Sequence, residues 1–260
     1  MPEGDTLFRT AQGLRPYLVG RDILSARAQG PGPVPQIQRV VGKRVDAVEA
    51  QGKNLLIRFD GGLELRTHLR MNGSWHRYRP GERWRRPPGR ARLVLEVDGT
   101  VAVCFDAPVV ELFETRAESL HPSLSRLGPD LLAPDFDVAE AHRRLRAPER
   151  GSMSISEALL DQRALAGIGN IWRNETLFAE RVDPFKPVRD VDDATLGRLV
   201  TTARRLLNES VQVAPGRAPM RVYRRTGRPC PRCGTAIRSA PLSAELPRTT
   251  FWCPTCQGGA

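Results

Sequence analysis

The sequence predicts an α+β protein with several domains, and three observations lead to this expectation. Short apolar runs separated by Gly, Asp and Pro fill residues 21–116, a pattern typical of β-strands joined by turns. Beyond this stretch the apolar period becomes that of amphipathic helices. Four closely paired cysteines follow near the end of the chain. We therefore expect a β-rich domain over residues 1–124, a helical domain over residues 125–215 and a small cysteine-held domain over residues 216–260.

The first expected element is an amphipathic helix. Residues 5–19 carry apolar side chains at helical spacing, beginning with Leu7 and ending with Leu18. Asp5 and Thr6 are residue types that cap helix N-termini through their side-chain oxygens. We expect the helix to begin at one of these two residues.

Strands are expected in the rest of the first domain. Five apolar runs predict them, namely Lys53–Phe59, Leu63–Leu69, Arg92–Val97, Val101–Phe105 and Val109–Phe113. Gly61-Gly62 and Asp98-Gly99 have the composition of hairpin turns. Residues 77–92 are rich in Pro, Gly and Arg, and this composition predicts an exposed loop.

Helix-start signals mark the second domain. Capping-box patterns begin at Asp137 and at Ser154, each with Glu three residues later. The acidic pair Asp192–Asp193 opens a further helix, which is expected to run to about Ser210. Residues 211–229 are rich in Pro, Gly and Arg and form the expected connector to the cysteine-held domain.

The four late cysteines have the spacing of a metal site. They follow the pattern C-x2-C-x19-C-x2-C and are Cys230, Cys233, Cys253 and Cys256. Two close pairs on tight turns place four thiolates around one Zn²⁺, and no ligand position is left open for catalysis. We expect one structural zinc ion; a pair of disulfides is the alternative. Cys104 lies in an apolar run and is expected in the core.

The charge of the chain favours a polyanionic partner such as nucleic acid. The chain has 40 basic residues against 29 acidic ones, a formal net charge of +11, and Lys53 is one of only three lysines. From Arg217 to Arg248 there are eight Arg and one acidic residue, which is dense enough for a nucleic-acid face. Genomic base composition is the alternative source of the general Arg excess.

No membrane or secretory segment is expected. No run approaches the roughly 20 apolar residues that a membrane span requires. Residues 1–20 contain charged side chains and no apolar signal core. We therefore expect a soluble intracellular protein.

The N-terminus carries a candidate nucleophile. Removal of Met1 exposes the secondary amine of Pro2, which can attack an aldehyde-level carbon and form an iminium ion. An α-amine titrates near 7.7–8, well below a lysine, so more of it is neutral at cellular pH. Glu3 is adjacent and could move protons. A processing signal without chemistry is the alternative interpretation of Met-Pro-Glu.

Four motifs in this order resemble one enzyme family. They are MPEGDT at the start, QGKN at Gln51–Asn54, LLDQRALAGIGNIWRNE at Leu159–Glu175 and RTTFWCPTCQ at Arg248–Gln257. Together they resemble formamidopyrimidine-DNA glycosylase and endonuclease VIII, which are bifunctional base-excision repair enzymes. The resemblance implies an N-terminal β-sandwich with its helix, a helix–two turns–helix domain and a zinc-finger hairpin. It also implies damaged DNA as partner, no organic cofactor, a monomer and a bacterial cytoplasmic location.

The resemblance also implies roles for individual residues. The catalytic residues would be Pro2, Glu3 and Lys53. The DNA-binding residues would be His68, Met71, Asn170 and Arg248. Each also has a structural interpretation: a strand-edge cation for the lysine, a structural histidine, a core methionine, and a capped helix hairpin around the asparagine. Glu175 is assigned no chemistry.

The substrate branch is expected to be that of oxidised pyrimidines. The purine-repair branch carries an Arg-Arg-Phe-Gly run where this chain reads Asp106-Ala-Pro-Val-Val-Glu111. The connector at residues 211–222 is also short for that branch's loop, although the Met71 segment differs from the usual Gln-Leu-Tyr of the pyrimidine branch. The alternatives are an oxidised-purine glycosylase and a non-catalytic zinc-ribbon DNA-binding protein, which would need neither Pro2 nor Glu3.

Overall fold

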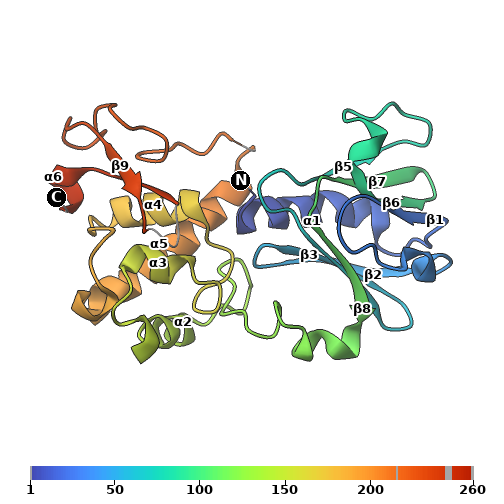
Figure 1. Ribbon diagram of the computed structural model, residues 1–260, viewed down its shortest axis with the longest axis horizontal. Helices are drawn as coiled ribbons and strands as arrows, with labels where there is room; N and C mark the ends of the chain where they lie inside the picture. Colours follow the sequence, from blue (N-terminus) through green and yellow to red (C-terminus); the bar gives the residue numbers. More distant parts are fainter. Residues whose placement is uncertain (1, 215, 244–247, 259–260) are drawn as a thin grey trace. The chain divides into compact units, whose positions relative to one another are not determined.

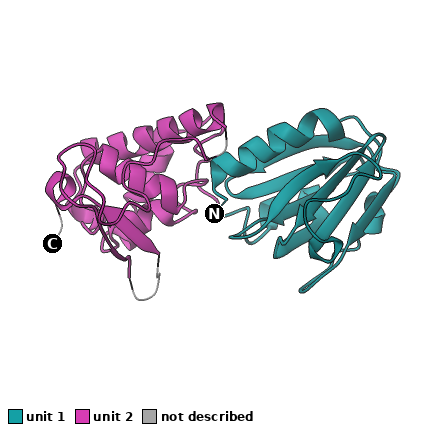
Figure 2. Ribbon diagram, turned by 90° about the horizontal axis from the view of Figure 1, so that it is seen from above, with its two compact units in different colours: residues 1–126 teal, residues 127–260 magenta. Residues whose placement is uncertain are grey.

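The chain folds into two compact units, residues 1–126 and residues 127–260 (Figure 2). The computed structural model describes all of the chain except residues 1, 215, 244–247 and 259–260. The domain boundary expected after residue 124 falls two residues before the end of the first unit and stays a prediction. The further division expected at residue 216 falls inside the second unit and stays a prediction.

Unit 1 contains two four-stranded antiparallel sheets that form a β-sandwich (Figure 1). The sheet ordered β1-β6-β7-β5 contains β1 (Ser25–Ala28), β5 (Ser74–Tyr78), β6 (Ala91–Val97) and β7 (Thr100–Phe105). The sheet ordered β2-β3-β4-β8 contains β2 (Val45–Gln51), β3 (Asn54–Phe59), β4 (Leu63–His68) and β8 (Val109–Glu114). Short 3-10 turns are η1 (Ile37–Val40), η2 (Pro88–Arg90) and η3 (Thr115–Leu120). The two expected hairpin turns join β3 to β4 and β6 to β7.

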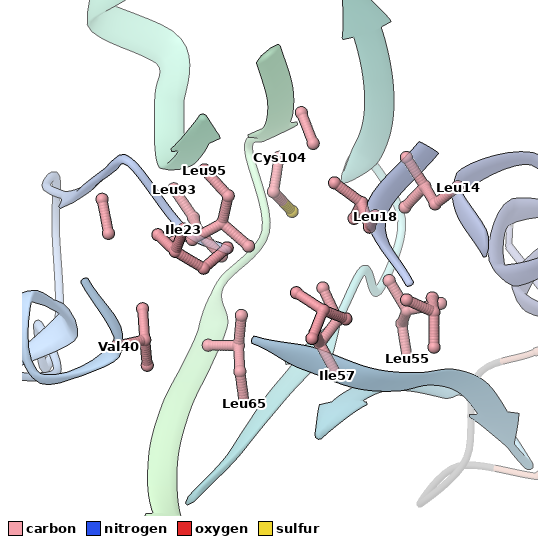
Figure 3. Close-up of a cluster of buried hydrophobic side chains, with 14 of the residues drawn as sticks. Leu14, Leu18, Ile23, Val40, Leu55, Ile57, Leu65, Leu93, Leu95 and Cys104 are labelled. Carbon is pink, nitrogen blue, oxygen red and sulfur yellow. The ribbon is translucent and has the colours of Figure 1, made fainter. Parts of the chain in front are cut away.

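The core of unit 1 lies between the two sheets and helix α1 (Gly4–Leu18). Figure 3 shows Leu14 and Leu18 of the helix with Ile57 from one sheet and Leu95 from the other. Cys104 in β7 is fully buried in this cluster, which confirms its expected core position. The apolar spacing of the N-terminal segment therefore encodes a helix whose buried face completes the sandwich core.

Some elements of unit 1 differ from the expectation. The N-cap of α1 is Glu3, and it makes no side-chain capping bond. Asp5 lies inside the first turn instead, where its carboxylate accepts from the Thr6 amide at 2.8 Å and from Arg9 at 3.0 Å. Polar and apolar residues are mixed in β1, β2 and β5. The sequence pattern therefore did not predict these three segments as strands. The expected loop at residues 77–92 is correspondingly shorter, because both of its ends are strand.

Unit 2 is helical and ends in the cysteine hairpin. Its elements are α2 (Val138–Leu145), η4 (Pro148–Arg150), α3 (Ile155–Leu160), α4 (Asn170–Ala179), η5 (Val188–Asp190), α5 (Asp193–Gln212), β9 (Arg238–Pro241), β10 (Thr249–Trp252) and α6 (Pro254–Gln257). The capping box at Ser154 is complete, and Asp192 caps α5 as expected. Asp137 caps α2, but Glu140 binds Arg143 and does not close a box. Across the part of the chain that the structure describes, no helix has the length and apolar character needed to cross a membrane.

Candidate nucleic-acid interface and catalytic residues

Pro2 and Glu3 lie directly before the first turn of α1. The Glu3 carbonyl accepts hydrogen bonds from the amides of Thr6 and Leu7 at 2.9 and 3.2 Å, so the helix fixes the backbone at this point. The Glu3 side chain is completely buried, whereas Pro2 is half-buried. The helix N-terminus disfavours positive charge nearby. An amine at residue 2 would therefore be held in one place and biased toward its neutral, nucleophilic form.

Lys53 lies in the two-residue turn between β2 and β3, and not in the strand where the sequence analysis placed it. Gly52 precedes it with φ +58°, a left-handed conformation that glycine adopts without strain. The Asn54 side-chain Nδ2 donates to the Gln51 carbonyl at 3.0 Å across the base of the turn. The tight hairpin therefore presents Lys53 at the end of the sheet.

A buried hydrogen-bond network supports this turn. The Asn54 side-chain oxygen accepts from Arg66 Nε at 2.9 Å, and Arg66 Nη1 donates to Glu111 Oε2 at 2.5 Å. His121 Nε2 lies 3.2 Å from the same Glu111 oxygen. Asn54 and Arg66 are buried, and a buried charge of this kind is stable only with such partners. The network ties the hairpin to strands β4 and β8.

His68 is brought next to the Lys53 turn by the strand register. It ends β4 and pairs with Asn54 at the start of β3. Burial first, and then the charges of Arg66, Arg70 and Lys53, lower the pKa of His68 to about 4. The Arg70 amide donates to His68 Nδ1 at 3.1 Å, so the neutral ring carries its hydrogen on Nε2. His68 can therefore donate one hydrogen bond to an anion without carrying charge.

Met71 lies on the loop after β4 and is 54% exposed, so it is not the core methionine of the alternative interpretation. Gly73 closes this loop by donating its amide to the Leu69 carbonyl at 2.9 Å. A Cβ at residue 73 would lie 2.6 Å from that carbonyl oxygen, so the close approach requires glycine. The loop is a short, tightly closed turn that presents an exposed flexible apolar side chain at its tip.

Asn170 begins α4 in unit 2, after the glycine turn that the sequence analysis expected. Gly167 has φ +94°, and Gly169 is the N-cap residue. Asn170 is buried, and its side-chain Nδ2 donates to the Thr249 carbonyl of β10 at 3.1 Å. Arg173 Nη2 donates to both Asn170 Oδ1 and the Thr249 carbonyl, at 2.7 and 3.2 Å. A buried guanidinium thus lies at the start of the helix, beside the amides that favour an anion there.

Arg248 directly precedes this junction and is exposed. Its carbonyl accepts from the Leu242 amide at 2.9 Å, which sets its place at the start of β10. One residue further along the chain, Thr249 makes the contacts to α4 described above. The Phe251 amide also donates to Asn174 Oδ1 at 2.8 Å. These hydrogen bonds therefore join the backbone next to Arg248 to the N-terminal part of α4.

The four late cysteines form one compact cluster. Their Sγ atoms all lie within 4.8 Å of one another, with Cys230 and Cys256 at 3.9 Å and Cys233 and Cys253 at 3.4 Å. Tetrahedral Zn–S bonds of about 2.3 Å imply S–S separations of about 3.8 Å. A disulfide would need about 2.05 Å. The donor set therefore fits a tetrahedral thiolate-bound metal ion with all four positions taken by protein.

The cysteine hairpin is docked against α4 at both helix ends. At the C-terminal end, Arg232 donates to the carbonyls of Phe178 and Ala179 at 3.0 and 3.3 Å. Phe178 also belongs to the apolar cluster that contains Cys230 and Cys253. The arginine adds a positively charged donor at two carbonyls of the last helical turn, one of which, that of Phe178, also accepts from the Arg181 amide. Metal binding and the geometry of α4 are therefore linked through direct contacts.

Glu175 has a structural role that the sequence analysis did not find. Its buried carboxylate accepts three backbone hydrogen bonds, from Arg221 at 2.9 Å, Val222 at 3.0 Å and Tyr223 at 2.8 Å. Burial raises the pKa of Glu175, and the three amide donors oppose that rise. Arg173 was likewise missed. No local pattern marks either residue, because their partners lie far away in the sequence.

Comparisons with known proteins agree on one family. Residues 1–108 match the formamidopyrimidine-DNA glycosylase N-terminal domain, and residues 127–220 match the formamidopyrimidine-DNA glycosylase H2TH domain. "Probable endonuclease 8 2" of Streptomyces coelicolor is 40% identical over 100% of this chain and 95% of its own length. "DNA-(apurinic or apyrimidinic site) lyase Nei2" of Mycolicibacterium smegmatis is 36% identical over 99% of each chain. The formamidopyrimidine-DNA glycosylase of Thermus thermophilus is 34% identical over 99% of each.

A solved structure has the same fold. Lactococcus lactis formamidopyrimidine-DNA glycosylase, bound non-covalently to DNA that contains an abasic site, superposes with a TM-score of 0.85. The match covers 99% of this chain and 100% of that chain at 23% identity. This chain thus has the same fold as that glycosylase, with a β-sandwich, a helix–two turns–helix segment and a cysteine hairpin.

Proposed function

Because the chain belongs to the formamidopyrimidine-DNA glycosylase and endonuclease VIII family of DNA glycosylases with abasic-site lyase activity, we propose that it excises oxidised pyrimidines from DNA. The observation that carries this preference is the segment Asp106–Glu111. Its last three residues belong to strand β8, and Glu111 is bound to the buried Arg66. The segment thus offers no arginine at the place where the purine branch has its Arg-Arg-Phe-Gly run.

Pro2 is the proposed nucleophile, with Met1 removed. Its amine nitrogen attacks C1′ of the damaged nucleotide, the C1′–base bond breaks, and the base leaves with a proton supplied by an acid. The C1′–O4′ bond of the sugar ring then breaks, O4′ takes a proton, and the nitrogen and C1′ form an iminium ion. Loss of a C2′ proton expels the 3′ phosphate by β-elimination, and loss of a C4′ proton expels the 5′ phosphate by δ-elimination. Glu3, which is buried directly beside Pro2 in the chain, is the proposed acid and base.

The remaining unit 1 residues are proposed to hold the substrate. Lys53 at the hairpin turn supplies positive charge for the phosphates and stabilises charge that develops at the sugar. Neutral His68 donates one hydrogen bond from Nε2 to the same backbone. Met71 enters the stack when the nucleotide is flipped out, because its exposed apolar side chain can replace the missing base contacts.

Unit 2 is proposed to bind the DNA backbone. The N-terminal turn of α4 with Asn170 and the neighbouring Arg248 form a phosphate site, supported by the buried Arg173. A single Zn²⁺ is proposed for Cys230, Cys233, Cys253 and Cys256. With all four positions filled by thiolates, the ion would stabilise the hairpin that carries Arg248 and take no part in the chemistry.

The lesion preference is tested with two matched duplexes. One contains thymine glycol, and the other contains 8-oxoguanine opposite cytosine. We expect base release and strand cleavage at thymine glycol to be faster by about tenfold or more. Glu3→Gln serves as the control that should bind both duplexes and release neither base. Faster release of 8-oxoguanine would favour the oxidised-purine alternative. DNA binding without release of either base would favour a non-catalytic zinc-ribbon protein.

A further inference from the structure

A second basic surface lies on unit 1, far in the sequence from the arginines of the cysteine hairpin. Arg27 of β1 and Arg83 and Arg85 of the β5–β6 loop are exposed and line one hollow of about 700 Å³. Trp84 and Pro87 form part of its wall. We call the three arginines the arginine platform. Their shared hollow distinguishes them from scattered surface charges.

The guanidinium groups of the arginine platform are not used inside the protein. Among the residues that the structure describes, none of the three guanidinium groups makes an ion pair or a hydrogen bond. Glu82 also lines the hollow, but its carboxylate accepts from the backbone amide of Arg79 at 2.9 Å. Uncompensated positive charge of this kind attracts an external anion.

The loop that carries the platform is rigidly held. Trp84 stacks on Tyr78 with ring centroids 6.0 Å apart and packs edge-on against Phe105 at 5.8 Å. The Arg85 amide donates to the Tyr78 hydroxyl at 3.0 Å. The side chains of Arg83 and Arg85 therefore project from a fixed backbone, which lowers the entropic cost of binding.

The same loop is joined to the Met71 loop. Arg86 Nη1 donates to the Asn72 carbonyl at 3.2 Å and to Asp106 Oδ2 at 2.5 Å. Arg90 Nε donates to the other oxygen of Asp106 at 2.8 Å. Asp106 thus holds both arginines, and Arg86 joins the loop to the segment that carries Met71. The platform has a fixed place relative to the side chain that we propose to enter the DNA stack.

We propose that the arginine platform binds backbone phosphates of the duplex that flanks the lesion. This inference rests on the proposed function, because Met71 in the stack brings the flanking duplex alongside the platform. Duplex DNA is stiff over this length and carries one negative charge per about 1.7 Å of axis. A rigid group of arginines beside the point of insertion therefore meets phosphates without any bending of the protein.

The test compares two charge-matched double variants. Arg83→Gln with Arg85→Gln removes two platform charges. Arg39→Gln with Lys43→Gln removes two positive charges beside the β3–β4 turn, at the end of the β2-β3-β4-β8 sheet opposite the Lys53 turn; within the described part of the chain neither side chain forms an ion pair. Binding is measured over a range of salt concentrations with a duplex that carries a stable abasic-site analogue. The duplex extends about one helical turn, about 10 bp, to each side.

We expect the platform variant to bind more weakly and to lower the slope of log Kd against log salt by about 2, since each phosphate contact contributes about 0.9. The control variant should keep a slope close to that of the unmodified protein. At saturating protein, and with a duplex that carries an authentic abasic site, the platform variant should still form the full borohydride-trapped adduct. An unchanged slope, or an equal loss in the control, would overturn the proposal. Absence of any adduct with the unmodified protein would count against the proposed function, while the slopes still test the platform.

Discussion

Glu3 is the residue whose burial bears most directly on the chemistry. An acidic side chain with no exposed surface is uncommon, because removal of a carboxylate from water costs free energy. Its backbone is fixed by the first turn of α1, and its neighbour in the chain is Pro2. The proposed acid and the proposed nucleophile are therefore held by one element.

The titration of His68 should affect the stability of the protein. We expect its ring to titrate near pH 4 and not near 6.5, because burial and three nearby cations disfavour the proton. The unfolded chain accepts that proton more readily, so the stability contributed by the neutral ring is complete above pH 6.5 and is lost as the pH falls from 6.5 to 4. Over this window the protein should lose up to about 3 kcal/mol more unfolding free energy than His68→Gln. Urea unfolding at several pH values gives both curves, and parallel curves would contradict the prediction.

Helix α4 connects several segments of the second unit. Its first turn contacts β10 through Asn170 and Arg173, and its last turn is capped by Arg232. Between these ends Glu175 holds the connector that leads to the cysteine hairpin. One helix therefore carries the proposed phosphate site and also fixes the two segments around it.

The Glu175 contact predicts the behaviour of the connector. Glu175→Gln removes acceptor capacity and places an amide donor against backbone N–H donors, which should cost about 2–3 kcal/mol locally. We expect hydrogen exchange at Val222 and Tyr223 to become about 30-fold to 160-fold faster. Glu209→Gln, which alters an exposed carboxylate of α5, should leave these amides unchanged. Retained protection in the Glu175 variant would show that other contacts hold the connector.

Features with local signals could be predicted from the sequence, and features with remote partners could not. The Ser154 capping box, the Asp192 cap and the cysteine cluster each depend on residues close together in the chain or on a known spacing. Glu175 depends on amides of the connector more than 40 residues away. The N-cap at Glu3 was missed because it makes no side-chain capping bond and leaves Asp5 within the first turn.

Charge is distributed unevenly at the scale of the whole molecule. Many of the exposed arginines form ion pairs with nearby acids, as Arg205 does with Glu209. The arginine platform and the exposed connector arginines Arg217, Arg221, Arg224 and Arg228 leave positive charge directed outward. The net charge of +11 therefore does not by itself show where the protein attracts DNA. These local groups of positive charge do.

Metal removal tests the link between the cysteine hairpin and DNA binding. Chelation should leave four thiolates without their ion, loosen the hairpin and weaken its contacts at both ends of α4. We expect weaker binding to lesion duplex and faster proteolysis in the hairpin, with the unfolding of unit 1 unchanged. Restoration by added Zn²⁺ is the control. Unchanged affinity in metal-free protein would contradict the proposed role of the metal.

The central claim is that the terminal amine at residue 2 forms the covalent bond to the sugar. The most direct measurement is borohydride trapping on DNA that contains an abasic site, followed by mass spectrometry of the adduct. We expect the reduced sugar to be attached to the nitrogen of Pro2 in a chain that lacks Met1, and the adduct to be lost with Pro2→Ala. An adduct mapped to Lys53 or another lysine, or one that forms equally with Pro2→Ala, would contradict the account.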